Sequence, residues 1–218
     1  MRLADANPSD AAYLGAMNIF RYLTIPLVLV ALSLPAMAAE KLSLNQISRY
    51  LNDLKTVKGA FTQINDDGTI STGTIYIKRP GRIRFEYDPP AEALVMAGGG
   101  QVAIFDNKSN QPPEQYPLNK TPLNLILERN VNLAKRNMVV GHQFDGTATQ
   151  VIAQDPANPE YGNIRLVFSG PPVQLRQWVI TSADGSTTTV VLGDVQTNAA
   201  MASALFSIPT EMGKRERR

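Results

Sequence analysis

The residues of this chain that could carry out chemistry are few and form no recognisable catalytic set. Its 218 residues include one histidine, His142, and no cysteine. A Ser-His-Asp triad would need that histidine, and no Gly-x-Ser-x-Gly sequence presents a nucleophilic serine. Zinc sites need several histidine or cysteine ligands, which this chain lacks. We therefore predict no enzyme activity, no metal site and no cofactor, and we interpret His142, close to Val139 and Val140, as structural.

Other polar signals have ordinary structural interpretations. Asp66-Asp67 and Asp155 lie in turn-like sequences, where aspartate usually caps the local backbone. The glycines Gly98 to Gly100 do not open a helix, so they lack the context of a phosphate-binding loop. The net charge is only +2, and the tail from Lys214 to Arg218 contributes +3 by itself, with four basic residues and one acidic residue. The composition does not favour nucleic-acid binding, and the tail is a solvated end or a weak contact with anionic headgroups.

One charged side chain has an unusual predicted position. In the stretch "GTIYIKRPGRIRFEYDPP", strand alternation places Arg79 on the same face as Ile75 and Ile77, with Tyr76 on the other face. Pro80-Gly81 suits the middle of a type II turn. A guanidinium therefore ends an otherwise apolar face. From position alone, the simpler interpretation is that Arg79 extends past the turn into water.

The surrounding elements are mostly short strands. A helix is predicted first, because Leu44, Ile47, Leu51 and Leu54 share one face and Ser43 can cap it. After Gly59, about eleven strand-like runs separated by hairpin-length turns predict an antiparallel meander. Thr121 and Pro122 open one short apolar helix carrying Leu123, Ile126 and Leu127.

Many of these strands carry apolar residues on both faces. Leu94 and Met96 oppose Val95, and Trp178 and Ile180 oppose Leu175 and Val179. A second layer could cover one face, or the sheet could enclose an apolar hollow. The sequence alone does not separate a filled core from a cavity.

The N-terminal region has the pattern of an export signal. A basic start at Met17 precedes the apolar run from Tyr22 to Leu34, and Ala36-Met37-Ala38 fits a cleavage site. The run is shorter than the roughly 20 residues of a transmembrane helix. We predict translation from Met17, cleavage after Ala38, and a single mature domain over residues 39–218 that is soluble outside the cytoplasm. Without cysteine, packing and hydrogen bonds must stabilise this exported domain.

The motifs together resemble a known family, the LolA outer-membrane lipoprotein carriers. The likeness covers essentially the whole mature chain and is most specific in "YIKRPGRIRFEYDPP", "YPLNKTPLNLILERN", "VKGAFTQ" and "LFSIP". Phe85 stands where tryptophan is common in that family. The resemblance implies a mostly β fold: a half-closed antiparallel β-barrel whose α-helical lid covers a hydrophobic cavity for the acyl chains of lipoproteins. It also implies a monomeric periplasmic carrier between an inner-membrane ABC transporter and an outer-membrane acceptor.

The resemblance assigns roles to particular residues. Arg79 matches an arginine that holds the lid shut in the empty carrier, which reverses the preference for a solvent-exposed side chain. The predicted cavity and lid residues are Ile47, Leu51, Leu54, Ile75, Tyr76, Ile77, Phe85, Tyr87, Leu123, Ile126, Leu127 and Trp178, and ordinary core packing is the alternative for any single one of them. The competing hypothesis is a lipid- or lipoprotein-sensing module of the envelope on the same barrel. A lipid hydrolase is disfavoured because no nucleophile is set up for it.

Overall fold

The computed structural model describes residues 40–91, 93–106, 111–135 and 137–215. All of them lie in one compact unit, Ala38–Arg218. Eleven strands within the described residues form one antiparallel sheet. Their bounds are β1 Thr56–Asn65, β2 Ile70–Lys78, β3 Ile83–Tyr87, β4 Leu94–Gly98, β5 Gln101–Phe105, β6 Glu114–Pro117, β7 Val139–Phe144, β8 Thr149–Gln154, β9 Asn163–Ser169, β10 Gln174–Thr181 and β11 Thr187–Thr197.

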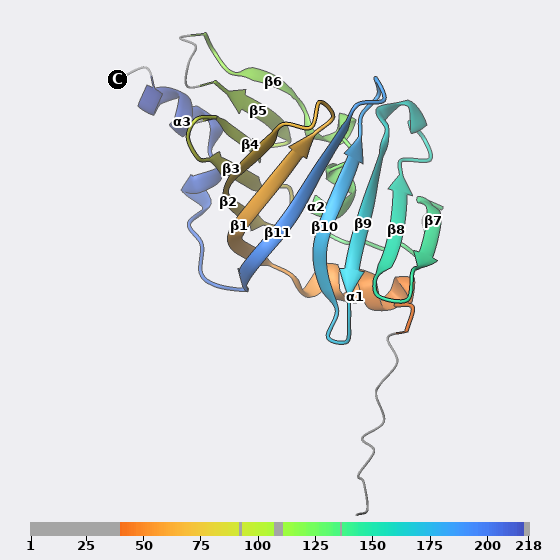
Figure 1. Ribbon diagram of the computed structural model, residues 1–218. Coiled ribbons are helices and arrows are strands. Elements are labelled where there is room, and N and C mark those ends of the chain that lie inside the picture. The colour runs from red at the N-terminus through yellow and green to blue at the C-terminus, as the bar shows by residue number, and fades with distance from the viewer. Residues whose placement is uncertain (1–39, 92, 107–110, 136, 216–218) are drawn as a thin grey trace, which may run out of the picture. The chain divides into compact units, whose positions relative to one another are not determined.

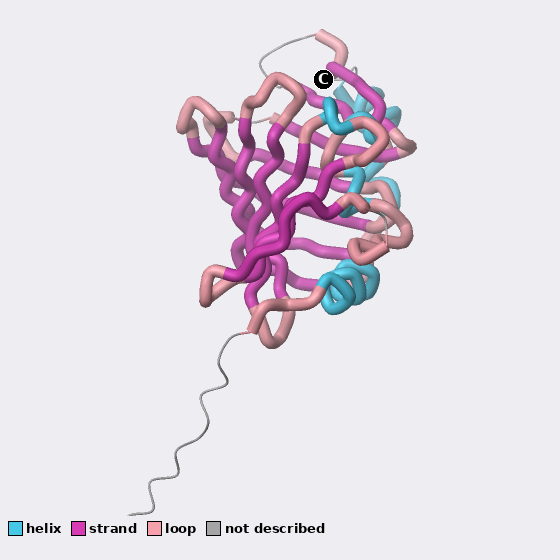
Figure 2. The backbone as a smooth tube through the Cα atoms, turned by 90° about the vertical axis from the view of Figure 1, so that its right-hand side faces the viewer, coloured by secondary structure: helices cyan, strands magenta, loops and turns pink. Residues whose placement is uncertain are grey.

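The sheet consists of two meanders joined in the middle. Its strand order is β6-β5-β4-β3-β2-β1-β11-β10-β9-β8-β7, so β1 pairs with both β2 and β11. The edge strands β6 and β7 do not pair with each other, and the sheet curls without closing (Figures 1 and 2). The predicted half-closed antiparallel barrel is confirmed. Because β6 and β7 are consecutive in the chain, the segment 118–138 that connects them must cross the opening between the two edges.

The first helix forms as its sequence predicts. Helix α1, Leu44–Asp53, begins after Ser43, whose hydroxyl accepts from the Gln46 N–H while the Gln46 side chain accepts from the Ser43 N–H. This capping box satisfies donors that the first turn of a helix leaves unpaired. Ile47 and Leu51 point into the core and are fully buried. Figure 2 shows α1 and α2 on the same side of the curved sheet.

The second helix is shorter than predicted. It follows the 3₁₀ turn η1, Leu118–Lys120, and α2 itself spans only Asn124–Leu127. Thr121 does not cap it: the Thr121 hydroxyl donates to the carbonyl of Leu118 instead. Within α2, the N–H groups of Asn124, Leu125 and Ile126 bond to carbonyls three residues back, as Leu125 does to Pro122. Local 3₁₀-type turns therefore replace the expected first turn of the helix.

A C-terminal layer covers the outer face of part of the sheet. After the 3₁₀ turns η2, Pro159–Tyr161, and η3, Ser203–Phe206, the chain ends its described part in α3, Ile208–Arg215. Ile208 and Met212 of α3 pack on a second apolar cluster formed by Leu94, Met96, Ala103 and Phe105. Val95, one step out of phase, faces the main core. The outer apolar face of β4 is thus packed against α3, while Val95 on its inner face points toward the main core.

One predicted strand alternation is wrong. A register shift between Leu175 and Gln177 adds a residue to β10 relative to β9. The bulge brings Leu175 and Trp178 to the same buried side, although simple alternation opposes them. Bulges have no strong sequence signature, and here only the pairing with β9 reveals it.

Several predictions concern residues outside the described part of the chain. The signal peptide, the start at Met17 and cleavage after Ala38 lie there, as do the last three residues of the basic tail. Among the described residues, no helix is both long and apolar enough to cross a membrane. The same residues contain no group of three or more histidine, aspartate or glutamate side chains placed to hold a metal ion.

Candidate functional site

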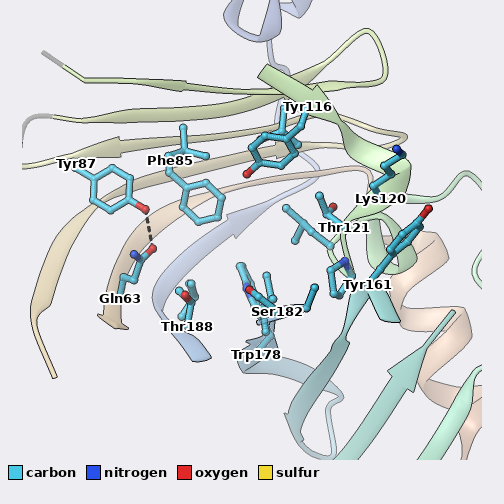
Figure 3. A pocket seen from close by; sticks show the side chains of 17 residues that line it. Gln63, Phe85, Tyr87, Tyr116, Lys120, Thr121, Tyr161, Trp178, Ser182 and Thr188 are labelled. Carbon is cyan, nitrogen blue, oxygen red and sulfur yellow. Dashed lines mark hydrogen bonds between the residues drawn. The ribbon is translucent and has the colours of Figure 1, made fainter. Parts of the chain in front are cut away.

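An apolar cavity of about 460 Å³ lies inside the curve of the sheet. This volume falls in the range of roughly 300–1,000 Å³ that is typical of small-molecule sites. Figure 3 shows Phe85 and Tyr87 facing Trp178 and Thr188 across it, with Tyr116, Lys120 and Tyr161 around the other side. The lining residues are Gln63, Phe85, Tyr87, Val95, Val102, Tyr116, Lys120, Thr121, Pro122, Leu123, Tyr161, Trp178, Ile180, Ser182, Ala183, Thr188 and Val190.

Aromatic rings build one wall of the cavity. Strand alternation directs Phe85 and Tyr87 of β3 inward, and the ring of Phe61 on β1 packs edge-on against both, at 5.2 and 5.1 Å between centroids. Phe85 also meets Trp178 of β10 edge-on at 6.4 Å. These contacts link distant parts of the sheet. Because the rings pack against each other, they form an apolar wall beside the cavity and do not fill it.

Polar groups of the wall are partly paired with each other. The Tyr87 hydroxyl donates to Gln63 Oε1 at 2.6 Å. Burial raises the pKa of Tyr87 to about 12, although the hydrogen bond with Gln63 opposes that shift. Burial likewise raises the pKa of Tyr116. Both phenols are therefore neutral at physiological pH, and the wall near them carries no phenolate charge.

The crossing segment covers the inner side of the sheet, and we call its described residues, 118–135 and 137–138, the cover. Its apolar side chains Leu118, Leu125, Ile126, Leu127, Val131 and Leu133 are buried in the main core. Pro122 and Leu123 contribute to the cavity wall. The cover therefore closes the cavity on one side and belongs to the same packed cluster as the strands.

The β2–β3 hairpin is tied to the cover by two hydrogen bonds. The backbone N–H of Gly81 donates to the Leu127 carbonyl at 2.8 Å. Arg79 Nη2 donates to the Glu128 carbonyl at 2.5 Å. Gly81 has a φ of 69°, the positive value that the turn prediction required. The guanidinium of Arg79 thus reaches the cover and does not extend into water.

The guanidinium of Arg79 is partly buried and lies near Glu128. Burial lowers the pKa of Arg79, and the nearby Glu128 opposes the shift. Arg79 Nε is buried and has no hydrogen-bond partner among the described residues. Arg79 is half-buried, and its bond to the Glu128 carbonyl satisfies part of the hydrogen-bonding capacity of the guanidinium.

A second set of hydrogen bonds, a few residues further along the cover, fixes it to α1. The Asn52 amide donates to the Val131 carbonyl and accepts from the Val131 N–H, both at 2.9 Å. The Ser48 hydroxyl accepts from the Leu133 N–H at 3.0 Å. The cover is therefore held in its middle part, by the hairpin that carries Arg79 at residues 127–128 and by α1 at residues 131–133.

The structure sorts the predicted cavity residues into three groups. Phe85, Tyr87, Leu123 and Trp178 line the cavity. Ile47, Leu51, Leu54, Ile75, Ile77, Ile126 and Leu127 are buried in the adjoining core and not on the cavity surface. Tyr76 was predicted wrongly: it lies on the opposite face, where Lys58 Nζ is 5.6 Å from its ring centroid. Residues 75 to 77 alternate along β2, so Tyr76 cannot share a face with its two neighbours.

Sequence reasoning missed most of the polar lining. Gln63 lies two positions after Phe61 on β1, so alternation could have found it. Lys120, Tyr161 and Ser182 come from turns far apart in the sequence, and no local pattern joins them. His142 has a structural position, with Nε2 2.8 Å from the Leu42 carbonyl oxygen and its own carbonyl accepting from Lys41 Nζ.

Comparison with known proteins identifies the family. The model of the family described as outer membrane lipoprotein carrier protein LolA matches residues 52–209, which include β1 to β11, the cover and Arg79. The chain belongs to the LolA family. Its match is longer than any single motif and covers the cavity as well as the tie to the cover.

Relatives of the LolA family match most of the chain at low identity. An outer-membrane lipoprotein carrier protein of Azotobacter vinelandii is 27% identical over 206 residues, covering 90% of this chain and 97% of that one. The corresponding protein of Coxiella burnetii is 25% identical over 185 residues, covering 81% and 87%. A solved LolA superfamily protein from Nitrosomonas europaea has a TM-score of 0.41 at 11% identity, covering 76% and 98%.

Proposed function

We propose that this chain is a monomeric periplasmic carrier for lipoproteins. It accepts them from an inner-membrane ABC transporter, shields their acyl chains, and delivers them to an outer-membrane acceptor. It uses no cofactor and catalyses no reaction. The observation that carries the proposal is the apolar cavity beneath a cover that is tied by Arg79. Membership of the LolA family supports it, because the curated relatives are named as outer-membrane lipoprotein carriers.

The energetics of acyl chains explain why such a carrier must hold its cargo and yet release it. Burying an acyl chain is worth about 0.8 kcal/mol per methylene. A lipoprotein with several chains therefore does not escape into water unaided. A simple apolar pocket would solve the first problem and create a second one, because it would also resist delivery. The loaded carrier must therefore lose some favourable interaction of the empty carrier, so that its free energy favours release of the cargo.

The tie at Arg79 is such an interaction. Opening the cover for cargo breaks the bond from Arg79 to the Glu128 carbonyl. Hydrogen bonds to charged groups contribute about 1.5–3 kcal/mol. The broken bond also leaves a guanidinium whose Nε is already without a partner in the closed state. The cost of breaking this bond therefore weakens the net affinity of the carrier for its cargo. When the cover closes after release, the bond forms again.

Reconstituted transfer tests the proposed function. The mature chain is incubated with inner-membrane vesicles containing the releasing transporter and a triacylated lipoprotein, and the soluble complex is identified by mass spectrometry. It is then mixed with outer-membrane vesicles. We expect one-to-one complexes that pass the lipoprotein on to those vesicles.

Two variants make this test specific for the cavity. Leu123→Lys places a charge in the cavity wall and should abolish complex formation. Val140→Lys changes a side chain that is 60% exposed on β7, and it should leave transfer intact. Binding without delivery would favour the sensing module, and equal transfer by both variants would contradict the proposed cavity.

A further inference from the structure

We infer that the indole N–H of Trp178 donates a hydrogen bond to the ester or amide carbonyl of a bound acyl chain. The inference rests on the proposed function, since it concerns how the same cavity recognises its cargo. It adds a chemical requirement: the carrier distinguishes acyl lipids, whose chains begin at a carbonyl, from alkyl lipids of the same length.

Trp178 contains an unsatisfied buried donor in the wall of the cavity. Its side chain is 0% exposed, and Nε1 has no hydrogen-bond partner among the described residues. Buried tryptophan N–H groups normally have partners, because leaving one unpaired is unfavourable. An orphaned donor beside a ligand-sized space therefore requires an explanation.

The neighbours of Trp178 on the sheet supply no acceptor side chain. Its cross-strand partners are Val190 on β11 and Leu166 on β9. The ring of Phe85 packs against it edge-on. A phenylalanine would give this wall the same apolar character without an unpaired donor. The cavity, which Trp178 lines, is then the candidate source of the acceptor, and since the indole has no accessible surface in the empty carrier, cargo must shift this wall to reach it.

The other polar pair of this wall is already satisfied internally. Tyr87 donates its hydroxyl proton to Gln63 Oε1, and the Gln63 amide donates to Asn65 Oδ1 at 2.7 Å. These groups do not need a ligand for their donors to be paired. The Trp178 N–H differs from them in being both buried and unpaired.

The chemistry of the wall defines the class of acceptor. Val190, Phe85 and Ile180 make the surroundings of the indole apolar, which strongly disfavours a charged carboxylate. A neutral carbonyl oxygen accepts a hydrogen bond without introducing charge. Ester and amide carbonyls lie at the head of the acyl chains of lipoproteins, where an apolar chain continues directly from the acceptor. The bond would therefore fix how deeply a chain enters the cavity.

Trp178 is the only tryptophan of the 218 residues, so it can be observed selectively. Protein labelled with ¹⁵N at the tryptophan indole gives a single indole resonance. We would titrate it with a monoacylglycerol and with the glycerol ether that has the same alkyl chain. The expected result is that the ester moves the indole proton downfield and slows its exchange with water, while the ether does neither. Ester binding should be roughly twofold to tenfold tighter, the effect of one neutral hydrogen bond.

Trp178→Phe removes the donor and retains an aromatic ring. It should lose the preference for the ester while still binding the ether, and its fold is checked by circular dichroism. Tyr76→Phe, on the convex face, is the matched control and should keep the preference. If Trp178→Phe does not fold, the indole resonance of the wild-type protein still decides the question. Equal binding of ester and ether with an unmoved resonance would overturn the inference alone, whereas binding of neither lipid would contradict the proposed function itself.

Discussion

The two ends of the inner face of this sheet are packed in opposite ways. Beside α1 the interior is solid: Ile47, Leu51 and the β9 residues Ile164, Leu166 and Phe168 are at most 1% exposed. Beside the start of the cover, the same sheet bounds a cavity of about 460 Å³. The two ends differ in their residues, since polar side chains such as Gln63 and Lys120 line the cavity, and they also differ in the helix that covers them.

Helix α1 is a fixed element. It has ten residues, a complete capping box, and the Tyr50 hydroxyl accepting from the Leu175 N–H on β10. The ring of Tyr50 also packs edge-on against Phe168 at 6.0 Å. Helix α2 has four residues and no side-chain cap, and hairpin contacts tie its end. A single uncapped turn has little stability of its own. In the proposed carrier we therefore expect the solid end to act as the scaffold and the cover to be the part that opens.

The two ends are expected to differ most in how much a core substitution lowers the free energy of unfolding. Leu51→Ala should reduce the free energy of unfolding by about 2–5 kcal/mol, because the packed end cannot collapse around the lost methyl groups. Leu123→Ala, in the cavity wall, should cost clearly less, since its side chain already borders empty space. Urea denaturation of both variants measures this. Equal losses would mean that the cavity end is as tightly packed as the α1 end.

Removing the hydrogen bonds that connect α1 to the cover is expected to have the next largest effect on the free energy of unfolding. Asn52→Ala removes both hydrogen bonds between α1 and Val131, which should cost about 1–3 kcal/mol in unfolding free energy. Hydrogen exchange should show faster exchange at the Val131 and Leu133 amides, while the β9 amides stay protected. Uniform acceleration across both regions would contradict a separate cover.

The smallest effect is expected from the alkaline titration of the cavity wall. The pKa of Tyr87 is about 12 in the folded protein and near 10 when unfolded, so its contribution to stability is complete below pH 10 and is lost as pH rises toward 12. We expect a loss of about 1–2 kcal/mol from this group. Tyr87→Phe should flatten the dependence of unfolding free energy on pH in that window more than Tyr76→Phe does. The reverse order would contradict the burial of Tyr87 beside the cavity.

The sequence predicted well those features that depend on local pattern. The spacing of Ile47 and Leu51 and the cap at Ser43 define α1 without any tertiary information. The turn residues divide the chain into the observed strands, and the period of two placed Arg79 on the inner face of β2. The same period, applied strictly, would also have excluded Tyr76 from the cavity.

The features that the sequence did not predict depend on contacts between distant segments. The bulge that brings Leu175 and Trp178 to one face exists only in the pairing of β10 with β9. The start of α2 is decided by local turns around Thr121 that compete with a helix. Lys120, Tyr161 and Ser182 meet at the cavity only because the sheet curls, and no spacing in the chain relates them.

The most direct test of the account is the release of cargo by a carrier without the tie. Arg79→Leu removes the bond to Glu128, and Arg82→Leu is the matched control, because the Arg82 guanidinium donates to Ser203 Oγ on the other side of the hairpin. With a fluorescent triacylated lipoprotein, we predict that Arg79→Leu binds about tenfold or more tightly and delivers correspondingly slowly to outer-membrane vesicles, while Arg82→Leu behaves as wild type. Unchanged affinity and delivery in Arg79→Leu would contradict the claim that the guanidinium holds the empty carrier closed.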